Sequence, residues 1–148
     1  MNKRTLLLSF LIFLSLVLTA CQQEPERTKS KNQGDIPSSA EGITIQLEKK
    51  QYMTKKEEAT LTIQNDNETR FLYGKEYLLE KNVNGTWYKI PLQEGMGFTA
   101  EGYNLIPGQT VSETIALDIF NEELSAGNYR MIKVFIDNKK NTVPKIKS

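Results

Sequence analysis

Residues 77–90 read YLLEKNVNGTWYKI, and this stretch predicts a β-hairpin. Two runs rich in β-forming side chains flank the dipeptide Asn84-Gly85. That dipeptide tolerates positive φ at both positions, as the two-residue type I′ turn requires. Pro91 lacks a backbone donor and is expected to end the second strand. The stretch therefore indicates an antiparallel β protein.

Alternating apolar and polar residues extend the β pattern along the chain. Further strands are expected over residues 43–48, 59–64, 111–117, 128–136 and 142–146, the last at a sheet edge. The run 128–136 is apolar on both faces, which favours a central strand covered on both sides. A short helical turn is expected at residues 118–124. About seven short strands separated by turns predict an all-β fold, an antiparallel β-sandwich over residues 42–148.

The charge balance and the rare residue types narrow the range of functions. The 148 residues carry 19 basic and 18 acidic side chains, a formal charge of +1. This balance argues against nucleic acid as a partner, because nucleic-acid-binding proteins normally have a basic face or stripe. The chain has no histidine and one cysteine, which rules out Ser-His-Asp and Cys-His nucleophiles, histidine zinc sites and an intrachain disulfide.

Carboxylates are the remaining candidates for acid–base catalysis. They are scattered over expected turns and strand faces, and no spacing indicates two carboxyls held about 5–10 Å apart in a cleft. Asp66-Asn67-Glu68 does not begin a calcium loop, because such a loop needs glycine at its sixth position, where this chain has Phe71. We therefore expect no enzymatic activity, no catalytic residue, no metal site and no cofactor.

The first residues have the pattern of an export signal. Lys3 and Arg4 precede an apolar run over residues 6–18, and small residues follow before Cys21. As a helix the apolar run spans about 20 Å, short of the roughly 30 Å hydrocarbon core, so a permanent transmembrane helix is disfavoured.

Residues 18–21, Leu-Thr-Ala-Cys, resemble the lipobox of bacterial lipoproteins. The resemblance implies cleavage between Ala20 and Cys21, which makes residues 1–20 a signal peptide, and a covalent lipid on the Cys21 thiol. It also implies a location on the extracytoplasmic face of the cell membrane, with the bilayer as a partner through the lipid anchor. Two or more acyl chains make such anchoring effectively stable. The alternative is an ordinary signal peptide with a chance cysteine.

Residues 21–41 are expected to form a flexible linker. Beyond the cysteine this segment has no aromatic residue, and Ile36 and Ala40 are its only apolar residues. Such a segment cannot bury enough surface to offset the entropy lost on ordering. As a coil it would reach roughly 25 Å, which would lift the domain away from the lipid headgroups.

Four segments in order resemble one family: residues 74–91, Met96-Gly-Phe-Thr99, Ile106-Pro-Gly-Gln109 and Gly127-Asn-Tyr-Arg130. They are similar to the bacterial immunoglobulin-like (Ig-like) domain of small lipoproteins and surface proteins of low-GC Gram-positive bacteria. The resemblance covers residues 42–136 and implies an Ig-like β-sandwich, with Tyr129 in a place like the tyrosine corner. The family has no shared chemistry, so it supplies no functional residues.

The loop over residues 92–105 has two interpretations. Met96, Phe98 and Tyr103 lie in or near its glycine-rich part, where they could plug the end of the sandwich or form an adaptable contact surface for a partner. The function predicted for the whole chain is a non-enzymatic binding or adaptor module for a protein or cell-wall partner. The alternative is a protease inhibitor or immunity-type protein that presents this loop to an enzyme.

Overall fold

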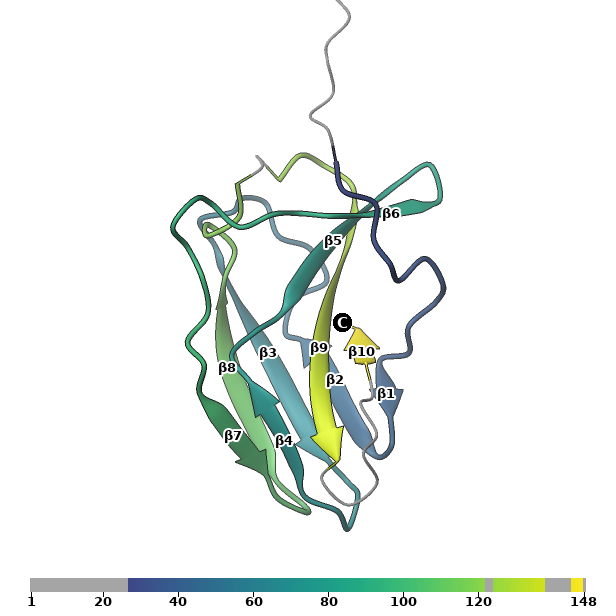
Figure 1. The fold of residues 1–148 in the computed structure, drawn as a ribbon, viewed down its shortest axis with the longest axis vertical. Coiled ribbons are helices and arrows are strands. Elements are labelled where there is room, and N and C mark those ends of the chain that lie inside the picture. Colours follow the sequence, from purple (N-terminus) through teal and green to yellow (C-terminus); the bar gives the residue numbers. More distant parts are fainter. Residues whose placement is uncertain (1–26, 122–123, 138–144, 148) are drawn as a thin grey trace, which may run out of the picture.

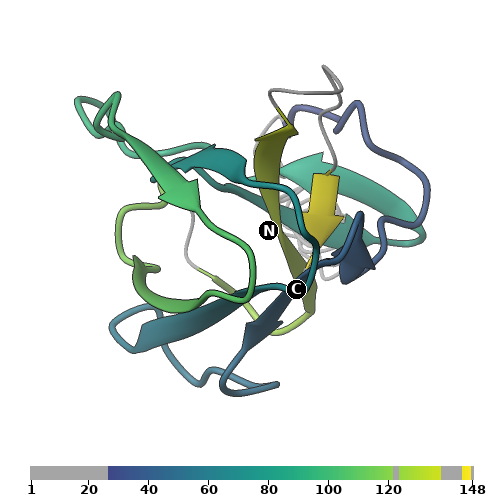
Figure 2. The ribbon, with the colours of Figure 1, turned by 90° about the horizontal axis from the view of Figure 1, so that it is seen from below.

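The computed structural model describes residues 27–121, 124–137 and 145–147, and these residues form two facing antiparallel sheets (Figure 1). The small sheet contains β1 (Ser39–Ala40), β2 (Ile43–Leu47), β3 (Glu58–Asn65) and β8 (Thr110–Ala116). The large sheet contains β4 (Phe71–Gly74), β5 (Leu78–Val83), β6 (Thr86–Lys89), β7 (Gly102–Leu105), β9 (Asn128–Asp137) and β10 (Lys145–Lys147). Seen along the long axis, β2 and β3 lie on one side of the molecule and β9 and β10 on the other (Figure 2). The predicted antiparallel Ig-like β-sandwich is confirmed.

The register explains why ten strands occur where about seven were expected. Ile132 pairs with Leu78 of β5 and also with Lys147 of β10, so these two strands flank β9 on opposite sides. β4 and β5 run one after the other along the same side of β9, separated by a short interruption (Figure 1). β7 pairs with β4, and β6 pairs with β5, so these two strands lie one after the other along the far side of β4 and β5. Interrupted strands thus account for most of the additional segments.

Apolar side chains from both sheets meet in one core. The small sheet contributes Ile43, Ile45, Ala59, Leu61, Ile63 and Ile115, and the large sheet contributes Phe71, Tyr73, Leu79, Met131 and Phe135. All are at most 7% exposed. Burying each large side chain contributes about 1.5–3 kcal/mol, so the predicted period-two alternation is also the main source of stability.

The predicted hairpin is confirmed in its turn geometry. Asn84 has φ 51° and Gly85 has φ 85°, the two positive values of a type I′ turn. The Asn82 side chain supports the turn by accepting a hydrogen bond from the Gly85 N–H at 2.9 Å. Pro91 lies just beyond β6, as expected.

The helical turn expected at residues 118–124 is wrong over its described part. Residues 118–119 form a simple turn, and Phe120 then pairs with Leu92 as an isolated β-bridge. Phe120 is only 1% exposed, so burial of its ring holds this stretch against the sandwich instead of letting it coil. The amide of Gln93 also donates to the Ile119 carbonyl at 2.9 Å.

The expectation of a flexible linker is wrong for residues 27–41. Residues 27–37, here called the N-terminal strap, run along the large sheet before β1 begins. Within the strap, Ser30 is 4% exposed and Ile36 is 7% exposed. The composition of this segment did not reveal the strap, because hydrogen bonds to the sheet hold it in place more than apolar contacts do. Residues 21–26 lie outside the described part of the chain.

Candidate binding groove

A groove of about 940 Å³ runs between the two sheets beside β2 and β9. Its apolar wall contains Ile45, Leu47, Ala59, Leu79, Leu117, Leu124 and Met131. One side is formed by β2 and the chain that follows it, and the other by β9 and residues 124–127, which precede it. The volume is within the range of ligand pockets, about 300–1,000 Å³, so the groove can take a small molecule or an extended chain.

Tyr52 supplies an unused polar group in the groove wall. Its ring packs against the core, while its hydroxyl oxygen is buried without a hydrogen-bond partner among the described residues. A buried hydroxyl left unsatisfied costs about 1–3 kcal/mol, and a ligand would recover that cost by displacing the atoms that cover the Tyr52 oxygen and bonding to it. Lys49 lies 5.8 Å from the centre of the same ring, and Lys50 and Lys147 also line the groove. The groove therefore combines an apolar wall with a basic rim.

Residues 49–56, here called the tip loop, are fixed by Glu57. Its carboxylate accepts hydrogen bonds from the amides of Met53 at 2.7 Å and Thr54 at 3.2 Å. The same carboxylate pairs with the Lys49 ammonium at 3.2 Å. The bond from the Met53 amide, with help from Lys49, lowers the pKa of Glu57 below its ordinary value. These bonds set the loop so that Tyr52 faces the protein and Met53 faces solvent, 85% exposed.

The opposite side of the groove is held by Ser125. Its carbonyl accepts a hydrogen bond from the Tyr129 hydroxyl at 2.6 Å, a bond to nearby backbone that fits the tyrosine-corner-like place expected for Tyr129. Its hydroxyl lies 2.5 Å from the Lys81 ammonium, and that ammonium lies 5.4 Å from the centre of the Tyr129 ring. Both sides of the groove are thus held by side-chain contacts.

A buried ion pair joins the N-terminal strap to the large sheet. Glu80 and Arg130 lie opposite each other on β5 and β9, with the Arg130 Nε and Nη2 atoms each 2.8 Å from Glu80 Oε2. The Ser30 hydroxyl bonds to the other carboxylate oxygen, and Arg130 donates to the carbonyls of Asn32 and Gly34. The two charges are 0–3% exposed, so the strap shields them from water.

Residues 39–146 match the family model described as a bacterial Ig-like domain. The chain belongs to that family. No match was found among curated proteins. A solved structure of the archaellum periplasmic stator protein complex FlaF and FlaG from Sulfolobus acidocaldarius is similar over 84% of this chain and 99% of that one, at 12% identity and a TM-score of 0.37.

Two of the three predicted loop residues of this Ig-like domain pack inward. The Phe98 ring lies 4.7 Å from that of Tyr77, and the Tyr103 ring lies 5.7 Å from that of Tyr73. A hydrogen bond to Glu101 raises the pKa of Tyr103. Met96 is 52% exposed, so it is the apolar side chain that the loop presents to solvent. Ala20 and Cys21 lie outside the described residues.

Sequence reasoning missed an ion pair inside the core. The Lys133 ammonium lies 2.7 Å from a Glu113 oxygen across the sandwich and donates to the Gly74 carbonyl at 2.8 Å. Burial lowers the pKa of Lys133, while Glu113 opposes that shift. The sequence does contain a signal for this pair, because both charged residues occupy core-facing positions of the alternating pattern. Glu113 stands between Val111 and Ile115, and Lys133 stands between Met131 and Phe135.

The described ranges hold no cluster of three metal-ligating acidic, cysteine or histidine side chains. Within those same ranges, no helix is long and apolar enough to cross a membrane.

Proposed function

We propose that this chain is a bacterial lipoprotein whose Ig-like domain is a non-enzymatic binding or adaptor module. Cys21 would carry the lipid and hold the domain on the extracytoplasmic face of the cell membrane. The support for the anchor is the export signal and the position of the sole cysteine directly after Leu-Thr-Ala.

The groove between β2 and β9 is the contact site that we propose. The observation that carries this proposal is Tyr52, which lines the groove and whose buried hydroxyl has no hydrogen-bond partner among the described residues. Binding sites commonly combine an apolar wall with a few placed polar groups. In this groove the wall is apolar and Tyr52 and the rim lysines supply the polar groups.

The chemistry of the groove favours a protein segment as its ligand. An extended chain with apolar side chains and a carboxylate would match the apolar wall and the rim of Lys49, Lys50 and Lys147. A neutral wall polymer would make no use of the rim charges, although Lys49 and Lys147 also pair with Glu57 and Asp35 within the chain. The alternative inhibitor function depends on the loop over residues 92–105, and the one large apolar side chain that this loop exposes is Met96.

Site-specific crosslinking in cells tests the proposal. A photoreactive amino acid at Asn128, which lines the groove and is exposed, should capture one partner of discrete mass from the anchored chain. The matched control places it at Ser112, an exposed position of β8 outside the groove. A Cys21→Ser form of the Asn128 variant controls for location. Capture that is equal at the two positions, or absent from both, would contradict the groove as the partner site.

A further inference from the structure

The tip loop has the composition of a segment that rests on a lipid surface. Its eight residues read KKQYMTKK, with lysine pairs at 49–50 and 55–56 and no acidic residue. Between the pairs Met53 is 85% exposed, the most exposed of the large apolar side chains in the described residues. Lysine pairs around an apolar side chain suit the boundary between headgroups and acyl chains, where the ammonium groups stay in the polar layer.

The exposure of Met53 is built into the loop. Glu57 binds the amides of Met53 and Thr54, and its own amide donates to the Thr54 carbonyl at 3.3 Å. Tyr52, one residue away, packs against the core. A tip held in this way can insert one side chain without first paying the entropy of ordering the loop.

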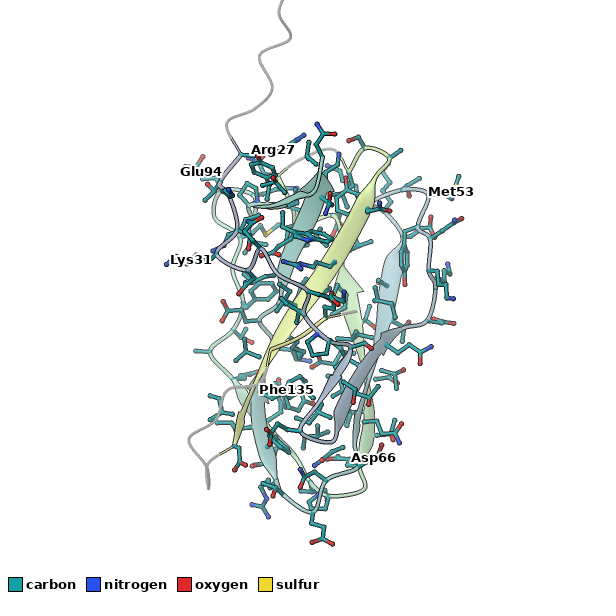
Figure 3. The ribbon with its side chains drawn as sticks, turned by 90° about the vertical axis from the view of Figure 1, so that its right-hand side faces the viewer. Arg27, Lys31, Met53, Asp66, Glu94 and Phe135 are labelled. Carbon is teal, nitrogen blue, oxygen red and sulfur yellow. The ribbon has the colours of Figure 1, made fainter. Side chains whose placement is uncertain are left out.

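The tip loop lies at the end of the molecule where the chain enters the domain. Arg27, the first described residue, and Met53 are both at the upper end in Figure 3, and Asp66 marks the opposite end. Cys21 and Arg27 are six residues apart in the sequence. Six residues extend at most about 21 Å, so a lipid on Cys21 would keep this end of the domain close to the bilayer.

We infer that the tip loop docks onto an anionic bilayer, with Met53 at the headgroup boundary and the Lys55-Lys56 pair, which does not line the groove, on lipid phosphates. The inference rests on the proposed lipid anchor at Cys21. The anchor makes weak docking sufficient, because a tethered loop meets the surface at an effective concentration of order millimolar. Each lysine close to an anionic surface favours docking by about five-fold. The groove would then open beside the bilayer, which suits a partner that is itself held at the membrane.

The test uses the full lipidated chain with an environment-sensitive fluorophore on Thr54→Cys, which leaves Met53 and the Glu57 contacts to the backbone in place. Lipid on Cys21 would occupy the only native thiol, so position 54 would be labelled alone. The matched control is Asp66→Cys, an exposed turn position at the other end of the domain (Figure 3). Both proteins are reconstituted into phosphatidylglycerol-containing vesicles and into phosphatidylcholine vesicles.

Docking predicts a blue shift at position 54 in the anionic vesicles, with quenching by a bilayer-embedded quencher at least three-fold stronger than at position 66. The shift should be lost at about 1 M salt and in a Lys55→Glu/Lys56→Glu variant that stays bound through its anchor. If the chain carries lipid mass on Cys21 and quenching is equal at positions 54 and 66, the docking of the tip loop is overturned and the lipid anchor still stands. Two labelled thiols and no lipid mass would overturn the anchor, and the docking that depends on it.

Discussion

Glu80 and Arg130 carry opposite charges where water does not reach, on the face of the large sheet that points away from the core. A buried pair adds little to stability beyond an apolar pair of the same size, since both ions lose their hydration. Loss of one partner is different, because it leaves the other charge buried alone. Here the cost is larger still, because Arg130 also holds the strap through the carbonyls of Asn32 and Gly34.

Arg130→Met should lower the free energy of unfolding by about 3–5 kcal/mol, measured by urea denaturation. The double variant Glu80→Leu/Arg130→Met should lose less than the single variant, because no lone charge remains. The control is Lys147→Met, which removes an ion pair with the exposed Asp35 and should change the stability little, because water screens an exposed pair. A single variant as stable as the control would contradict the assigned role of Arg130.

Tyr77 makes stability depend on pH in the alkaline range. Burial is the main cause that raises the pKa of Tyr77 from 10 to about 12, and its hydroxyl donates to the Ala116 carbonyl at 3.0 Å. The stabilising contribution of the neutral phenol is present below pH 10, the unfolded value, and is lost as the pH rises toward 12.

Tyr77→Phe should therefore cost about 1 kcal/mol at neutral pH through the lost hydrogen bond, and it should flatten the fall in stability between pH 10 and 12. Chemical denaturation of both proteins over that pH range measures the difference between their free energies of unfolding. The other tyrosines are present in both proteins, so their titration cancels in this difference. Parallel curves for the two proteins would show that Tyr77 does not titrate differently on folding.

At the scale of elements, local patterns predicted the strands whose side chains alternate. β2, β3 and β8 were expected because one apolar face of each packs in the core, and the Asn84-Gly85 turn followed from φ preference alone. β9 was expected because both of its faces are apolar, but its predicted cover on both sides is incomplete, since Val134 and Ile136 are 37% and 39% exposed. β4 was missed because its four residues are too few to show an alternation. The bridge at Phe120 was missed because its partner, Leu92, is distant in the sequence.

The candidate site was less predictable than the fold. The groove is formed by β2, the tip loop and the approach to β9, and only tertiary structure brings these segments together. Met96, Phe98 and Tyr103 were singled out for composition, and two of the three serve packing. The strap was taken for a linker because hydrogen bonds to a sheet leave no pattern in the composition of the segment that makes them.

Truncation tests the strap as part of the fold. A chain that begins at Arg27 should unfold at the same urea concentration as one that begins at residue 21, while a chain that begins at Ser38 should lose about 2–4 kcal/mol. The loss would come from removal of the buried Ile36 side chain and of the contacts that Ser30 and Gly34 make to the ion pair. Equal stability of all three chains would show that the strap lies on the domain without stabilising it.

At the scale of the whole molecule, the proposed lipid on Cys21 would hold the domain with one end toward the bilayer. The strap matters here, because residues 27–37 were expected to belong to a flexible linker and instead lie along the large sheet. The domain would therefore stay near the surface with a restricted orientation. Its groove would be presented to partners at the membrane more than to those in the medium.

Location, orientation and partner class all depend on the lipid anchor at Cys21. The decisive measurement is mass spectrometry of the N-terminal peptide from the membrane fraction. We expect a mature chain that begins at Cys21 with diacylglyceryl mass on its sulfur, and a Cys21→Ser chain that keeps residues 1–20 or leaves the membrane. A mature chain that begins elsewhere, with a free thiol on Cys21, would show that the domain is not anchored in this way.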